Sequence, residues 1–194
     1  IALICAGGVV ILGILPGVIL AVSLSILELV KRLARPHSET LGFIAGVEGA
    51  YDIADQPFAK EIPGLKIFRY DAPLFFANCT DFFNKVIALA QEDTKVIILN
   101  MEANTDLDAT SLEILEELIL QFEDSGVELW FARLNRDVAE IMQKHGILEL
   151  INSDHIYPTI KVAVKVYLTR YPVAHRPFYD TTPPEPLDLK MLQE

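Results

Sequence analysis

The amino-acid sequence predicts an α/β domain, with a central sheet and helices packed against it, preceded by a long apolar segment. Three observations lead to this prediction. Residues 1–27 contain no charged side chain. Stretches of β-strand character then open the rest of the chain, and helical and extended patterns alternate after them. The run KVIIL at residues 95–99 is continuously apolar, which is typical of a strand buried on both faces of a sheet.

The apolar segment predicts a membrane span, because a run of 18 or more apolar residues is long enough to cross a bilayer. A signal peptide has basic residues before a shorter apolar core. Here the basic residues Lys31, Arg32 and Arg35 follow the apolar run instead. By the positive-inside rule, this basic linker, residues 31–39, predicts that the following domain lies in the cytoplasm.

The transmembrane segment, residues 1–30, carries helix-breaking residues in its middle. A single helix over the 27 apolar residues would extend about 40 Å, more than the hydrocarbon core of about 30 Å. Pro16 and its neighbours therefore predict a break near residues 15–17. Unwound backbone at membrane depth has to be covered by protein. The chain also begins inside the apolar run without Met, so we expect a fragment with membrane helices upstream.

The domain that follows, residues 40–170, belongs to an acidic part of the chain. From Pro36 onward there are 26 acidic and 13 basic residues. Nucleic acid is not an expected partner, because phosphate contacts need a basic face. The two cysteines and four histidines are scattered, so the sequence predicts no disulfide framework, metal site or cofactor. Membrane lipid is the expected partner of the span.

The order of elements follows from periodicity and from capping residues. Strands are expected over 40–46, 65–70, 95–99 and 127–132, with a short extended piece at 74–77. Helices are expected after Asn78, from the loop at 106–111 to Gly126, after Asn135, and from Pro158 to about residue 168. The tail, residues 171–194, holds five of the eleven prolines, so we expect it to be disordered or draped on the surface.

The segment Asp106-Leu-Asp-Ala-Thr-Ser places two acids and two hydroxyls where a helix begins. Asp108 predicts an N-cap that accepts a hydrogen bond from the backbone N–H of Thr110 or Ser111. A hydroxyl at a helix N-terminus is also a place where an added phosphate is stabilised. Asp106 and Asp108 would repel such a phosphate. Two interpretations stay open: a simple helix cap, or a regulatory loop.

Several motifs, taken in order, resemble the cytoplasmic STAS domain of the SulP family of anion transporters. They are Arg32-Leu-Ala-Arg-Pro-His, Leu41-Gly, Tyr51-Asp-Ile, the run from Ile62 to Asn78, Asp106-Leu-Asp-Ala-Thr-Ser, and Asp154-His-Ile-Tyr-Pro-Thr. The stretch from Val10 to Val22 resembles the last membrane helices of that family. The resemblance covers residues 7–170 and is specific because the motifs occur in order.

The resemblance implies a STAS-like domain with a mixed sheet, attached to a multi-pass protein of the plasma or inner membrane. It implies a symporter or exchanger of a small inorganic anion such as sulfate, bicarbonate or chloride, commonly a homodimer. The transport site would lie in the membrane region upstream, so no residue of this chain is assigned to it. The STAS domain would serve regulation, dimerisation or partner binding. Phe43, Phe58 and Trp130 are candidates for exposed apolar contacts, although a core position is favoured for Trp130.

In soluble anti-sigma factor antagonists the matching loop is Asp-Ser-Ser-Gly, and its second hydroxyl accepts phosphate. Thr110 aligns with that position, and Ser111 replaces the glycine. An alternative function is therefore a membrane-tethered signalling module switched by phosphorylation, with Asp106, Asp108, Thr110 and Ser111 as its regulatory loop. An enzyme is not expected, because the sequence has no glycine-rich phosphate loop and no GxSxG motif.

Overall fold

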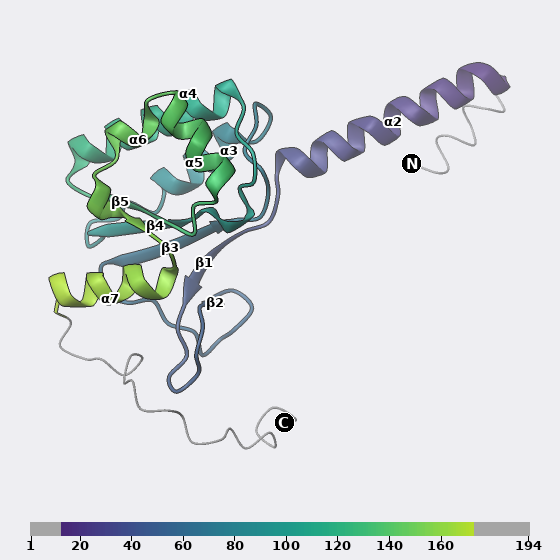
Figure 1. The fold of residues 1–194 in the computed structure, drawn as a ribbon. Helices are drawn as coiled ribbons and strands as arrows, with labels where there is room; N and C mark the ends of the chain where they lie inside the picture. The colour runs from purple at the N-terminus through teal and green to yellow at the C-terminus, as the bar shows by residue number, and fades with distance from the viewer. Residues whose placement is uncertain (1–12, 173–194) are drawn as a thin grey trace, which may run out of the picture.

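The structure, a computed structural model, describes residues 13–172 and shows an α/β domain from which one long helix projects (Figure 1). The helices are α2 (Ile14–Ala34), α3 (Cys79–Ile87), α4 (Ala109–Ser125), α5 (Arg136–Lys144), α6 (Ile147–Leu150) and α7 (Ile160–Arg170). The strands are β1 (Ser38–Gly42), β2 (Tyr51–Asp52), β3 (Leu65–Tyr70), β4 (Val96–Asn100), β5 (Glu128–Ala132) and β6 (Ile156–Tyr157). Two short 3-10 helices are η1 (Met101–Ala103) and η2 (Ser153–His155).

The six strands form one mixed sheet in the order β2-β1-β3-β4-β5-β6. β1 is antiparallel to both of its neighbours, whereas β3, β4, β5 and β6 run parallel to one another. Parallel neighbours need a crossover connection, and α3 and α4 provide it between β3, β4 and β5. The structure confirms the predicted fold class, a central mixed sheet with packed helices.

The strands bury their side chains on both faces of the sheet. Ile97 and Leu99 of β4 lie in a hydrophobic cluster covered by α3, α4, α5 and α6. Val96 and Ile98 lie in a second cluster, which α7 covers from the other face (Figure 1). Because neither face meets water, every position of the strand can be apolar, as its sequence predicts.

α2 begins at Ile14, directly after Gly13, whose backbone φ is 89°, and runs through residues 15–17. Pro16 is the third residue of the helix, where a backbone N–H has no intrahelical acceptor, so the missing donor costs nothing. The first intrahelical hydrogen bond runs from Gly17 N to Gly13 O, at 3.1 Å. Proline and glycine thus lie at the start of α2, and the helical piece expected before them lies outside the described part of the chain.

α2 has the length and hydropathy of a membrane span over Ile14–Lys31, with a mean hydropathy of 2.0 and only 6% of these residues buried in the protein. The linker between α2 and β1 is residues 35–37, shorter than the expected 31–39. The helix ends there because Pro36 disfavours helical backbone at the residue before it. Residues 1–12, the remainder of the predicted segment, lie outside the described part.

Capping explains most helix boundaries in the domain. Gly126, at φ 74°, ends α4, and the side chain of Asn135 caps α5, both as predicted. The last helix begins at residue 160, two residues later than predicted from Pro158. The reason is a cap at Thr159, whose Oγ1 accepts a hydrogen bond from Val162 N at 3.2 Å.

Two expectations for the segment after β3 are wrong. Residues 74–77 are not a strand, since Leu74 alone forms a β-bridge, to Leu107, and a turn follows. Asn78 precedes α3, but its side chain does not cap that helix. It turns back and accepts a hydrogen bond from Phe75 N at 2.9 Å, which closes the turn.

The three aromatic residues considered for surface contacts divide between core and surface. Phe43 is buried, with 5% of its surface exposed, so the expectation of surface contact is wrong for this residue. Trp130 is completely buried, in agreement with the core position favoured for it. Phe58 is 76% exposed and remains a surface residue.

The tail expected from residue 171 begins with a residue that packs on the domain. The Tyr171 ring lies 5.1 Å from the Tyr167 ring, and its hydroxyl donates a hydrogen bond to Glu128 at 2.8 Å. Residues 173–194 lie outside the described part of the chain.

Candidate functional site

The loop predicted from the sequence lies at one edge of the sheet, where the carboxyl ends of the parallel strands meet. The connections after β3 (residues 71–78), after β4 (101–108) and after β5 (133–135) all leave from this edge. Ligands and partners of α/β sheets commonly bind at this edge, because the loops there vary without disturbing the core.

Asp108 joins two of these loops. Its Oδ1 accepts hydrogen bonds from Ser111 N at 2.8 Å and from Ser111 Oγ at 2.7 Å, which confirms the predicted N-cap of α4. Its Oδ2 accepts a third hydrogen bond, from Phe76 N at 2.7 Å, 32 residues earlier in the chain. One carboxylate therefore holds the loop after β3 against the first turn of α4.

The hydrogen bonds at Asp108 also set its charge. Burial by itself would raise the pKa of this carboxyl, but the side-chain and backbone donors of Ser111 and the N–H of Phe76 outweigh it. The pKa of Asp108 is therefore lowered, and the group is ionised at neutral pH. An ionised acceptor at a helix N-terminus also interacts favourably with the helix dipole.

The other loop residues differ in their accessibility. Ser111 is completely buried, and its hydroxyl is used by Asp108. Thr110 and Asp106 are exposed. Of the two hydroxyls in the predicted loop, only that of Thr110 is presented to the surface.

Two more contacts fix the loop after β4 on the loop after β3. Leu74 and Leu107 form a parallel β-bridge. Asn104, only 1% exposed, donates from Nδ2 to Ala72 O at 2.7 Å, while its Oδ1 has no hydrogen-bond partner among the described residues. The two loops thus form one rigid unit.

This unit also contacts the end of α2. Asn78 donates from Nδ2 to Leu33 O at 3.3 Å and to Pro73 O at 2.9 Å. Asp71 N donates to His37 O in the linker at 3.0 Å. The carboxyl edge of the sheet is therefore the side of the domain that faces α2, as Figure 1 shows.

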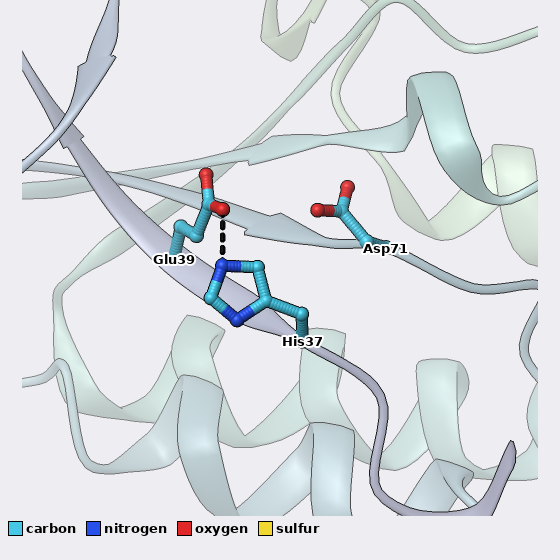
Figure 2. A group of neighbouring side chains, drawn as sticks. All are labelled: His37, Glu39 and Asp71. Carbon is cyan, nitrogen blue, oxygen red and sulfur yellow. Dashed lines mark ion pairs between the residues drawn. The ribbon is translucent and has the colours of Figure 1, made fainter. Parts of the chain in front are cut away.

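A cluster of charged side chains lies beside the linker, on β1 and at the end of β3. Figure 2 shows the His37 ring directed at Glu39, with which it forms an ion pair when protonated, and Asp71 opposite them. Arg69 binds both oxygens of Asp71, with Nε–Oδ1 at 2.6 Å and Nη2–Oδ2 at 2.9 Å. Its Nη1 also lies 3.9 Å from Glu39.

These side chains could together contact a metal ion, since their ligand atoms lie within 4.8 Å of one another. An ion would have to displace Arg69 from Asp71, however, so the present geometry is that of an ion-pair network that ties β1 to β3. Sequence reasoning missed this cluster, because His37 and Asp71 are far apart in the chain. The antiparallel register of β1 and β3 alone brings them together.

Residues 56–163 match the family model of the STAS domain, which is more than half of the chain. The chain therefore belongs to the STAS domain family. The mixed sheet with its packed helices is the fold of this family.

Among curated proteins, the chain is similar to a Mycobacterium tuberculosis protein described as "Probable sulfate transporter". The two are 40% identical over 162 residues, which cover 82% of this chain and 29% of that protein. It is also similar to "High affinity sulfate transporter 2" of Stylosanthes hamata, with 27% identity over 82% of this chain and 26% of the relative. The chain thus spans less than a third of the length of these relatives.

Two solved structures are similar to this fold. The murine solute carrier 26 family member A9 anion transporter, in its inward-facing state, matches 79% of this chain and 25% of its own, with a TM-score of 0.71 and 26% identity. The STAS domain of a SulP transporter from Vibrio cholerae matches 61% of this chain and 91% of its own, with a TM-score of 0.50 and 26% identity.

Proposed function

We propose that this chain is part of a secondary-active transporter of a small inorganic anion, with sulfate as the first candidate substrate. The similarity to the Mycobacterium tuberculosis sulfate transporter, at 40% identity over 82% of this chain, carries this proposal. The geometry supports it, because a helix long enough to span a membrane leads into the STAS domain through a linker of three residues. In this proposal the transport site lies in membrane helices encoded upstream.

Uptake of labelled sulfate by cells that lack their own sulfate transport tests the proposal. The gene that encodes this chain should give faster sulfate uptake than an empty vector, and unlabelled sulfate should compete. Bicarbonate and chloride as competitors distinguish sulfate from the other candidate anions. A gene product that reaches the membrane and moves none of the three anions contradicts the proposal.

In this transporter the STAS domain would lie in the cytoplasm and serve regulation, dimerisation or partner binding. The basic residues Lys31 and Arg35 at the end of α2 support the cytoplasmic side. A homodimer is expected, and cross-linking of the complete membrane protein checks it, since a product that remains monomeric contradicts dimerisation.

A regulatory role for the loop before α4 rests on the hydroxyl of Thr110. This side chain is exposed in the first helical turn, where free backbone N–H groups and the dipole stabilise an added phosphate. Asp108 opposes the phosphate by charge repulsion. The same exposure supports the second candidate function, a membrane-tethered signalling module switched by phosphorylation.

Substitution of Thr110 by Ala and by Glu separates regulation from simple capping. If the loop is regulatory, the two variants should change the rate or the control of anion uptake in opposite directions. Thr80 provides a matched control, because it is also exposed and also the second residue of its helix, α3. If the Thr110 variants behave like Thr80→Ala and Thr80→Glu, the loop is a helix cap alone.

A further inference from the structure

The end of α2 fixes the position of the domain relative to a membrane. The span Ile14–Lys31 has 18 residues, which extend about 27 Å as a helix and match the hydrocarbon core of about 30 Å. Leu33 lies two residues beyond the span, about 3 Å further along the helix axis. Its carbonyl accepts the hydrogen bond from Asn78. The loop after β3 is therefore held directly below the hydrocarbon core.

This loop exposes an aromatic ring. Phe76 is 69% exposed, although its backbone is fixed by Asp108 and its ring lies edge-on to Phe75, with centroids 5.5 Å apart. Phe76 is two residues from Asn78, so their Cα atoms are at most about 8 Å apart. The headgroup layer on each side of a bilayer is about 5–8 Å thick. Phe76 lies within reach of that layer.

We propose that Phe76 inserts into the interfacial layer of the membrane that α2 crosses, so that the STAS domain rests on the lipid surface at its carboxyl edge. The proposal rests on the membrane span in the proposed function. Apolar rings on a surface next to a bilayer bind by burying their area at the boundary of headgroups and acyl chains. Lys31 and Arg35, both exposed, supply positive charge at the same depth for lipid phosphates.

A second exposed phenylalanine provides the internal control. Phe58 is 76% exposed, slightly more than Phe76. It lies two residues before Lys60, which forms a β-bridge with Phe43 just past the far end of β1. β1 begins at the linker and extends away from α2 by about 3.3 Å per residue, roughly 15 Å over its length. The lipid surface that reaches Phe76 therefore does not reach Phe58.

Tryptophan fluorescence of the full 194-residue chain in lipid vesicles tests the proposal. Phe76→Trp, Phe58→Trp and Val22→Trp are compared with the parent chain, whose single tryptophan, Trp130, is buried. The vesicles contain phosphatidylcholine, either unmodified or carrying bromine on the acyl chains, close to the headgroup in one set and near the chain ends in another. Circular dichroism of each variant checks that the fold is retained.

The added emission of Phe76→Trp should be lost in the vesicles with bromine close to the headgroup, while that of Phe58→Trp should persist. Val22→Trp, in the middle of the span, should be quenched by bromine near the chain ends if α2 crosses the bilayer. Quenching of Val22→Trp without Phe76→Trp overturns the inference and leaves the span intact. If neither Val22→Trp nor Phe76→Trp is quenched, α2 does not cross the bilayer, and the membrane span in the proposed function is wrong as well. Equal quenching of Phe76→Trp and Phe58→Trp also overturns the inference. If neither bromine in the lipid nor iodide added to the buffer quenches Phe76→Trp, the ring is covered by protein, and the inference is wrong in that case too.

Discussion

At the scale of single residues, Asp108 shows what sequence spacing reveals and what it does not. Its role as the cap of α4 could be predicted, because the acceptor and the N–H of Ser111 are three residues apart. Its hydrogen bond to Phe76 could not be predicted, because only the folded sheet brings β3 and β4 together. The same limit applies to Asn78, which could be named as a helix cap but holds the end of α2 instead.

Replacement of Asp108 by Ala should lower the free energy of unfolding by about 1–2 kcal/mol, because the helix loses its cap and Phe76 N loses its acceptor. Asp106→Ala is the matched control, since Asp106 is exposed and lies outside the cap. Its effect should stay within about 0.5 kcal/mol. Denaturation of both variants in detergent measures the difference, and equal losses would contradict the role of Asp108.

Asp108 should also contribute to acid sensitivity. Because its pKa is lower in the folded state, its contribution is complete above the pKa of an unfolded Asp, about 3.9, and is lost as the pH falls through the folded pKa.

At the scale of elements, α7 packs on the sheet through its apolar face, and one carboxylate at the start of β5 holds its C-terminal end. Glu128 accepts hydrogen bonds from Trp130 Nε1 at 2.9 Å, Tyr171 Oη at 2.8 Å and Arg170 Nη1 at 2.7 Å, and His155 Nε2 lies 3.1 Å away. Periodicity predicts that α7 exists, since its apolar positions are local. It does not predict these contacts of Glu128, because Arg170 and Tyr171 lie 42 and 43 residues further along the chain.

Glu128→Gln should lower the free energy of unfolding at pH 7 by about 1–3 kcal/mol, because the donors lose a charged acceptor. Burial by itself would raise the pKa of Glu128, but the hydrogen bonds from Tyr171 and Trp130 and the charge of Arg170 lower it overall. The stabilisation is thus complete above the unfolded Glu pKa, about 4.3, and is lost as the pH falls from there through the lower pKa of the folded state.

The measurement compares urea unfolding at pH 7 and pH 4 for the parent, Glu128→Gln and the exposed control Glu123→Gln. The stability of Glu128→Gln should fall less on acidification than that of the parent, because one carboxylate no longer titrates. Unchanged pH dependence in Glu128→Gln would show that the contacts of Glu128 carry no charge-dependent energy. The pKa of His155 is also lowered, mainly by burial, so its own effect on stability begins as the pH falls below the unfolded His pKa of about 6.5. A third measurement at pH 5.5 separates this effect of His155 from that of Glu128.

At the scale of the whole molecule, the apolar span and the order of the longer helices and strands could be predicted, because each rests on periodicity within short windows. The mixed sheet was expected from the family resemblance, and the short elements β2, α6 and β6 were not predicted. The domain limits could not be predicted, because they depend on pairing across the sheet. β1 begins at Ser38, where it pairs with Tyr70, and Tyr171 packs on Tyr167. Both ends lie outside the predicted limits, 40–170.

A chain of residues 36–172 should therefore fold as a soluble acidic unit, while the full chain needs detergent. The chain 40–170 should be less stable, since it lacks Ser38 and Glu39 of β1 and the Tyr171 hydroxyl that Glu128 binds. Thermal unfolding of the two chains side by side checks this. A 36–172 chain that stays unfolded in dilute buffer, or equal melting temperatures for both, would contradict these limits.

The central claim is that α2 attaches this acidic STAS domain to the cytoplasmic side of a membrane. The most direct measurement labels a single cysteine, placed at the exposed Ser153 after Cys5 and Cys79 are replaced, with a membrane-impermeant maleimide. In intact cells that express the complete protein, the account predicts no labelling at this position, and full labelling once the membrane is permeabilised. Efficient labelling of intact cells would place the domain outside and contradict the account.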